Sequence, residues 1–109
     1  MIINTTETVP GKRITQTFGL VRGNTIRARH LGRDIMAGLK SMVGGEIYEY
    51  TKLMAEAREQ ALDRMKQEAE TIGANAIVCV RFSTSVIMGG AAELLAYGTA
   101  VRVEDQPGS

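Results

Sequence analysis

Hydrophobic and polar positions divide the chain into segments of two kinds. Residues 13–27, 74–88 and 93–104 alternate between apolar and polar side chains, a period of two that is typical of β-strands. Residues 2–8 form a short segment rich in β-branched side chains. Residues 34–72 instead repeat apolar side chains every three or four positions, which predicts helix. The expected order is therefore β-β-α(-α)-β-β.

Glycines mark the ends of several of these segments. Pro10 and Gly11 suit the two central positions of a type II turn. Gly73 is placed to end the long helix. Gly89 and Gly90 predict a hairpin between the last two strands. Within the strand at residues 13–27, Gly19 and Gly23 indicate bulges or points of close backbone approach.

The helical segment has one apolar stripe and one charged face. Gly44 and Gly45 interrupt it without breaking the phase of the stripe, so we expect a long kinked helix in which the glycines let another backbone approach closely. An anion site at the start of a second helix is the alternative, against which Glu46 argues. The stripe comprises Ile47, Tyr50, Met54, Ala57, Ala61, Met65, Ala69 and Ile72, and the charged face comprises Glu49, Lys52, Glu56, Glu59, Asp63, Lys66 and Glu70.

Each predicted strand presents an apolar face. Strands grouped before and after a helix indicate an α+β domain with an antiparallel sheet packed on that helix. One helix covers one face only, so the other face needs a partner and a homo-oligomer is expected. In the strand at residues 13–27, the expected apolar face comprises Ile14, Phe18 and Leu20. In the strand at residues 74–88 it comprises Val78, Val80 and Phe82, and the opposite, mixed face comprises Ile77, Cys79, Arg81, Ser83 and Ser85. In the strand at residues 93–104 it comprises Leu95, Tyr97, Thr99, Val101 and Val103.

Composition and charge narrow the class of protein. The 109 residues suit a single domain at 1–104 with a polar tail at 105–109. The first 40 residues carry seven basic and two acidic side chains, and the remainder six basic and ten acidic. No apolar run approaches the roughly 20 residues of a bilayer span, and the start of the chain lacks the features of a signal peptide. With one cysteine, the chain is expected in the cytoplasm.

The best candidate for a ligand-facing patch is the cluster Arg27, Arg29, His30 and Arg33. Phosphate or a nucleic-acid backbone would suit it, but a sequence pI of about 7.9 and the scarcity of aromatic residues argue against nucleic acid. Salt bridges to the acidic helix of a neighbouring subunit explain the arginines equally well. His30 could act as a general base oriented by Asp34, although a structural role for this histidine is commoner.

A metal site would need ligands from more than one subunit. The chain has one cysteine and one histidine, and no spacing typical of a zinc site. A soft-metal site would combine Cys79 with methionines such as Met88. A strand cysteine is, however, more often a small apolar residue than a ligand.

The chain closely resembles the YbjQ-like family of small bacterial proteins of unknown function. The resemblance runs from Ile3 to Val103 and rests on GGEIYEYTKLMAEAREQALDRM, GANAIVCVRFSTS and GAAELLAYGTAV. It implies a dodecin-like α+β subunit that assembles into a homo-oligomeric ring, expected to be a pentamer. The family also carries the label of a heavy-metal-binding domain. No catalytic residues follow from the resemblance.

The leading hypothesis is a non-enzymatic cytoplasmic ring that binds a small ligand or ion at its subunit interfaces, with Gly44, Gly45 and Glu46 at a packing contact. One alternative is a heavy-metal-binding protein with ligands shared between subunits. A second is an enzyme with an inter-subunit site near His30 and Asp34.

Overall fold

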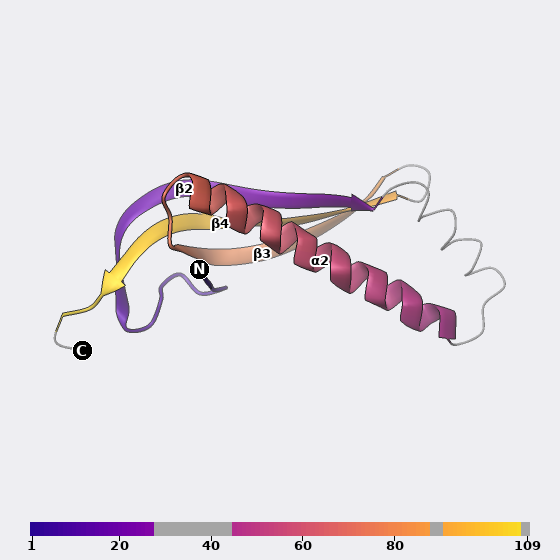
Figure 1. The fold of residues 1–109 in the computed structure, drawn as a ribbon, viewed down its shortest axis with the longest axis horizontal. Coiled ribbons are helices and arrows are strands. Elements are labelled where there is room, and N and C mark those ends of the chain that lie inside the picture. The colour runs from indigo at the N-terminus through magenta and orange to yellow at the C-terminus, as the bar shows by residue number, and fades with distance from the viewer. Residues whose placement is uncertain (28–44, 88–90, 108–109) are drawn as a thin grey trace.

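The computed structural model describes residues 1–27, 45–87 and 91–107, within which one helix lies across one face of a sheet (Figure 1). This arrangement confirms the α+β class and, for the described residues, the predicted order of strands and helix. The described elements are β1 (Ile2–Ile3), β2 (Lys12–Arg27), α2 (Gly45–Thr71), β3 (Ala76–Ile87) and β4 (Ala91–Asp105).

The four strands lie in the order β1-β3-β4-β2. β4 pairs antiparallel with both β2 and β3, whereas β1 pairs parallel with β3. The expectation of a purely antiparallel sheet is therefore wrong at β1, and the sheet is mixed. A parallel pair requires a long crossover, which β2 and α2 supply between β1 and β3.

The predicted turns are confirmed where the structure describes them. The Lys12 N–H donates to the Val9 carbonyl over 3.0 Å, and Gly11 has φ 78°, as a type II turn requires. At the end of α2, Gly73 has φ 93° and the N–H of Ala74 donates to Ala69 over 3.0 Å, in the manner of a Schellman motif. Pairing of Ile87 with Ala91 confirms the final hairpin, whose residues 88–90 lie outside the described part.

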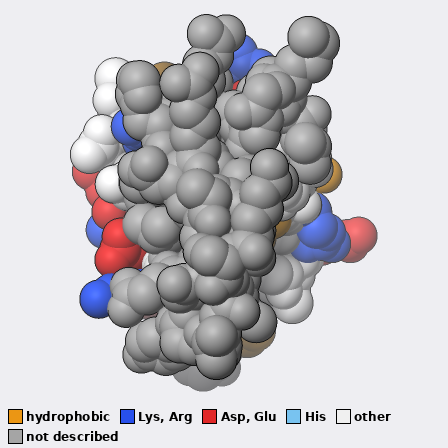
Figure 2. Space-filling view, turned by 90° about the vertical axis from the view of Figure 1, so that its right-hand side faces the viewer, with side chains coloured by type: hydrophobic (Ala, Val, Ile, Leu, Met, Phe, Trp, Pro, Cys, Tyr) orange, Lys and Arg blue, Asp and Glu red, His pale blue; other side chains and the backbone are white. Residues whose placement is uncertain are grey.

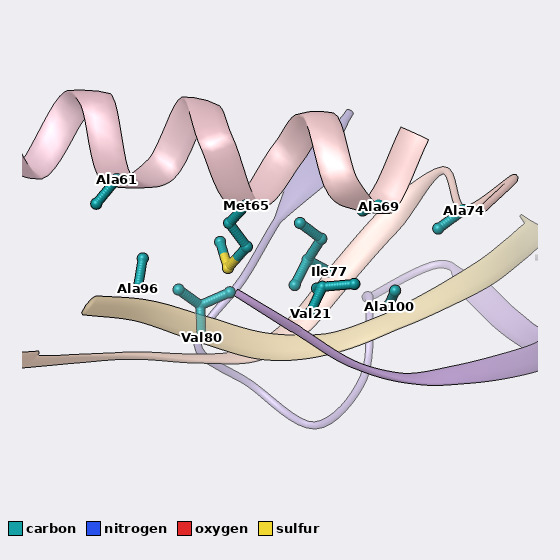
Figure 3. Packing of buried hydrophobic residues seen from close by; sticks show 9 residues of the cluster. All are labelled: Val21, Ala61, Met65, Ala69, Ala74, Ile77, Val80, Ala96 and Ala100. Atoms are coloured by element: carbon teal, nitrogen blue, oxygen red, sulfur yellow. The ribbon is translucent and has the colours of Figure 1, made fainter. Parts of the chain in front are cut away.

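The predicted stripe of α2 forms the centre of the core (Figure 3). Ala57, Ala61, Met65 and Ala69 are fully buried, and Met65 is among the largest fully buried side chains. Ile72 was expected in the stripe but is 44% exposed, because the helix ends at Thr71 and the chain turns away. The core cluster comprises Val21, Ala61, Met65, Ala69, Ala74, Ile77, Val80, Ala96 and Ala100.

The helix backbone lies directly on β2 at Gly23. A Cβ atom added at this glycine would lie 2.2 Å from the carbonyl oxygen of Ala61 and 2.3 Å from the backbone nitrogen of Met65. The prediction of close approach at Gly23 is therefore confirmed. The reason is space rather than backbone conformation, since Gly23 is not among the positive-φ residues of the described chain.

Ile14, Phe18 and Leu20 were expected on one apolar face of β2, but this is wrong: Phe18 packs against the helix-side cluster, whereas Ile14 and Leu20 are exposed. Register irregularities between Ile14 and Gln16 and between Thr17 and Gly19 interrupt the alternation. An extra residue in a strand moves the following side chains to the other face. As a result Val21 is buried under the helix, whereas Leu20 is 67% exposed.

A second, smaller cluster covers one end of the sheet face opposite α2. Val101 and Val103 of β4 are buried there, on the face predicted for them, together with Val9 from the N-terminal segment. Farther along the same face of β4, Leu95, Tyr97 and Thr99 are only half-buried. The N-terminal segment therefore covers only part of this face, and the remainder is open in the described chain.

Candidate functional site

Most of the predicted ligand-facing residues lie outside the described part of the chain. This holds for Arg29, His30, Arg33, Asp34, Gly44 and Met88. Arg27 ends β2, and Gly45 and Glu46 begin α2, but the side chains of these residues are not described. The packing role of the paired glycines and the kink therefore stay predictions.

Cys79 lies in a β-bulge of β3. Its φ is 57°, and the register with β4 shifts between Val78 and Arg81. The N–H of Cys79 donates to the Thr6 carbonyl over 2.9 Å, and the next N–H donates to Asn4 over 3.0 Å. The N-terminal segment thus continues along the edge of β3 beyond β1.

The predicted alternation of side chains along β3 is wrong at the bulge. Cys79 was expected to share a face with Ile77, but it packs beside the smaller cluster with Val78, and Ile77 and Val80 both lie in the helix-side cluster. One extra residue at the bulge accounts for the change of face. Cys79 is a partly buried residue at the edge of this cluster rather than a fully buried core residue.

No group of three or more His, Cys, Asp or Glu side chains that could hold a metal ion occurs among the described residues. Cys79 is the one thiol of the chain, and Met88, its suggested companion, lies outside them. The predicted Cys79–Met88 combination therefore stays untested.

Two arginines flank a tyrosine on the open part of the sheet. Arg22 of β2 and Arg81 of β3 are both paired in register with Tyr97 of the central strand β4. Their sequence neighbours Val21, Val80 and Ala96 are buried on the helix side, so these three side chains lie together on the opposite face. We refer to Arg22, Tyr97 and Arg81 as the arginine–tyrosine row.

The two arginines of this row differ in their contacts. Nη1 of Arg81 donates to the carbonyl oxygens of Thr5 and Val80, over 2.9 and 2.8 Å. Arg22 is exposed and has no hydrogen bond or ion pair within the described chain. The two salt bridges among the described residues lie elsewhere, joining the beginning of β2 to the end of β4.

Sequence reasoning did not single out the arginine–tyrosine row. Arg81 was placed on a mixed face and Tyr97 on an apolar face, and nothing along the chain related the two. Only the pairing register of β2, β4 and β3 brings the residues together. A usable signal was an arginine on each of the two strands beside β4, at a position that alternation leaves off the core.

At the other end of β2, charges are paired. Lys12 donates a hydrogen bond to Asp105, and Arg13 lies 3.7 Å from Glu104. The hydrogen bond from Lys12, and then its positive charge, hold the pKa of the Asp105 carboxyl below its ordinary value of 3.8. This end is electrostatically balanced, in contrast to the arginine–tyrosine row.

Comparison with known proteins identifies the class. A family model described as “Putative heavy-metal-binding” matches residues 1–104. The UPF0145 protein of Methanosarcina acetivorans is 61% identical over 103 residues, which cover 94% of this chain and 97% of the relative. UPF0145 protein DET1617 of Dehalococcoides mccartyi is 61% identical over 104 residues, covering 95% of this chain and all of the relative.

A solved structure confirms the fold type. The protein, from Pediococcus pentosaceus, has unknown function and is assigned to the DUF74 family. It superposes with a TM-score of 0.62 over 95% of this chain and 98% of its own, at 18% sequence identity. This likeness bears on the fold alone.

The fold and the comparisons together define a small two-layer α+β protein of an uncharacterised class. The chain belongs to the YbjQ-like family, whose close members here are UPF0145 proteins. Because the relatives include proteins of archaea, the description of the family as bacterial was too narrow. Among the described helices, none is long and apolar enough to span a membrane.

Proposed function

We propose that the protein is a non-enzymatic, homo-oligomeric ring of the cytoplasm that binds a small ligand or ion at its subunit interfaces. The observation that carries this proposal is the extended form of the subunit. Its Cα radius of gyration is 17.6 Å, whereas a compact chain of this length has about 13 Å. A subunit this extended leaves much of its surface for contacts with other copies.

Exposed apolar side chains on both faces of the sheet support contacts between copies. Leu20 is 67% exposed on the sheet face opposite the helix, and Phe82 is 45% exposed on the helix side. Phe82 pairs with Ala96 of β4, but α2 lies mainly over β2, and it leaves Phe82 exposed although Ile77 and Val80 of the same strand are buried. Two different exposed surfaces suit a head-to-tail contact, which closes into a ring when the rotation between copies permits.

The distribution of charge favours the same assembly. α2 carries seven acidic and four basic residues, whereas β2, β3 and β4 together carry six basic and three acidic ones. Charged side chains of both signs are visible at the left and right sides of the space-filling view (Figure 2). Helix and sheet layers of opposite charge attract each other between copies. A ring of five, as the family resemblance implies, is part of this proposal.

Replacement of Leu20 tests the proposed assembly. Leu20→Glu places a charge on the exposed apolar position and should reduce the subunit number measured by sedimentation velocity. Gln16→Glu is the matched control, because Gln16 is an exposed polar residue of the same strand. Wild-type protein that sediments as a monomer, or a Leu20→Glu protein of unchanged subunit number, would contradict the role proposed for this face.

Heavy-metal binding is the second candidate, and the description of the matched family favours it. In this version Cys79 and its copies in neighbouring subunits supply the soft ligands, because a single chain offers one thiol. Metal analysis of protein purified without chelator should then give a fixed metal content per ring that Cys79→Ser abolishes. Metal content unaffected by Cys79→Ser would exclude this ligand.

A catalytic role near His30 and Asp34 is the remaining candidate, and it rests on the sequence alone. His30→Ala would abolish turnover in an enzyme of this kind but leave a binding ring intact.

A further inference from the structure

The arginine–tyrosine row carries positive charge that the described chain does not neutralise. Arg22 has no partner there, and Arg81 is hydrogen-bonded to neutral carbonyl groups, which leave its charge in place. Glu93 lies on the same face of β4, but it is four positions along the strand from Tyr97, which places their Cα atoms about 13 Å apart. Glu93 also accepts a hydrogen bond from the Asn24 amide over 3.2 Å.

The row contains two exposed arginines and one half-buried aromatic side chain. Tyr97 belongs to the central strand and is half-buried between two strands that each present an arginine. The Cα atoms of Arg22 and Arg81 are two strand spacings apart, about 9.5 Å. The next row along the sheet, Asn24, Leu95 and Ser83, adds an amide and a hydroxyl to this face.

We propose that the arginine–tyrosine row binds a phosphorylated aromatic molecule, such as a nucleoside monophosphate. The ring of the ligand lies on Tyr97, its phosphate is held by Arg22, and Arg81 adds positive charge. A guanidinium group binds phosphate through two parallel hydrogen bonds, and an aromatic side chain on an open sheet provides a stacking surface. This inference rests on the proposed function, because it names the class of the small ligand.

The competing occupant is the acidic helix of a second copy. Its carboxylates would also neutralise the arginines, but they would use Arg22 to hold subunits together rather than to bind ligand. The two cases differ in what loss of Arg22 changes: ligand affinity in the first, subunit number in the second.

Isothermal titration of the full-length protein with adenosine monophosphate, inorganic phosphate and adenosine tests the proposal. Adenosine monophosphate should bind more tightly than either component and more weakly as salt increases. Arg22→Gln should weaken its binding by about tenfold to a hundredfold, and Tyr97→Leu should remove its advantage over inorganic phosphate. Arg13→Gln is the matched control, because Arg13 lies on the same strand beside Glu104, and it should bind as the wild type does.

Three results would overturn the proposal: no saturable binding to the wild type, equal binding to wild type and Arg22→Gln, or equal affinity for phosphate and adenosine monophosphate. Native mass spectra of the same samples separate this failure from failure of the proposed ring. A monomer that still binds adenosine monophosphate through Arg22 would refute the proposed ring but not the ligand site. A ring that binds none, and that dissociates on Arg22→Gln, refutes the ligand site and assigns the row to subunit contact.

Discussion

Replacing Gly23 with alanine should strongly destabilise the fold, because α2 leaves no room for a side chain at this position. The new Cβ atom would meet the carbonyl oxygen of Ala61 at 2.2 Å, the backbone nitrogen of Met65 at 2.3 Å and Cβ of Arg64 at 2.8 Å. Ordinary contacts between such atoms are about 3.5–4.0 Å. Since two of the three neighbours are backbone atoms, no side-chain rotation relieves the overlap, and the helix itself must move by about 1 Å.

The size of the effect follows from what that movement disturbs. A gap of about 0.5–1 Å in a packed interface forfeits a quarter to a half of each dispersion contact across it. Met65, Ala61 and Ala69 are fully buried at this interface. Overpacked cores lose about 1–3 kcal/mol, occasionally more, and the backbone contacts at Gly23 place the expected loss at about 3 kcal/mol or above. Domains of ordinary stability have only about 5–15 kcal/mol in total.

Urea unfolding followed by circular dichroism measures this loss, at equal subunit concentrations because assembly contributes to stability. Gly98→Ala is the matched control. Its added Cβ would meet Cγ2 of Ile77 at 2.8 Å and Cγ2 of Val80 at 3.2 Å, which are side-chain ends, and only the Val78 carbonyl, at 3.0 Å, is backbone. Gly98→Ala should therefore cost less than Gly23→Ala. A loss below about 1 kcal/mol for Gly23→Ala would refute the packing of α2 against β2 at this point.

Three further predictions concern single side chains. The side-chain amide of Asn75 donates to the Val103 carbonyl over 2.9 Å and accepts from the Val103 N–H over 2.8 Å. Asn75→Ala should therefore lower the free energy of unfolding, measured in urea, by about 1–3 kcal/mol. The Thr25 hydroxyl is buried and has no hydrogen-bond partner among the described residues, so Thr25→Val should stabilise the fold by about 1 kcal/mol in the same assay. Because Lys12 lowers the pKa of Asp105, the interaction between the two side chains stabilises the fold above pH 3.8, and this stabilisation is lost as pH falls below that value. In Lys12→Gln, titration of the carboxyl group by NMR should show the pKa of Asp105 returning to 3.8.

The helix and its core were predictable because they depend on local patterns. A step of four residues relates Ala57, Ala61, Met65 and Ala69, and all four are fully buried. The end of the helix at Gly73 likewise follows from residue type, since the left-handed backbone conformation that often ends a helix favours glycine. These features need no knowledge of which strands are neighbours.

The faces of the strands were harder to predict because bulges carry weak sequence signals. A single extra residue near Phe18 exposes Leu20 and buries Val21, and another at Cys79 divides β3 between two clusters. Cys79 is not a glycine, so its left-handed conformation had no obvious marker.

The arginine–tyrosine row was beyond sequence reasoning for a further reason. Arg22 and Arg81 are 59 positions apart in the chain and meet only across β4, so strand order and register had to be known first. The parallel pairing of β1 with β3 was missed on the same ground. Long-range pairing depends on the whole fold rather than on the pattern within one segment.

Native mass spectrometry of wild-type protein, freshly purified without added metal, tests the central claim most directly. The proposed ring predicts a single species whose mass is a fixed multiple of the 11.8 kDa subunit, with five as the expected multiple. Additional mass that survives chelator would be the bound small ligand, and additional mass removed by chelator would be a metal. A spectrum that contains only the monomer, under conditions in which the protein is folded, would contradict the account.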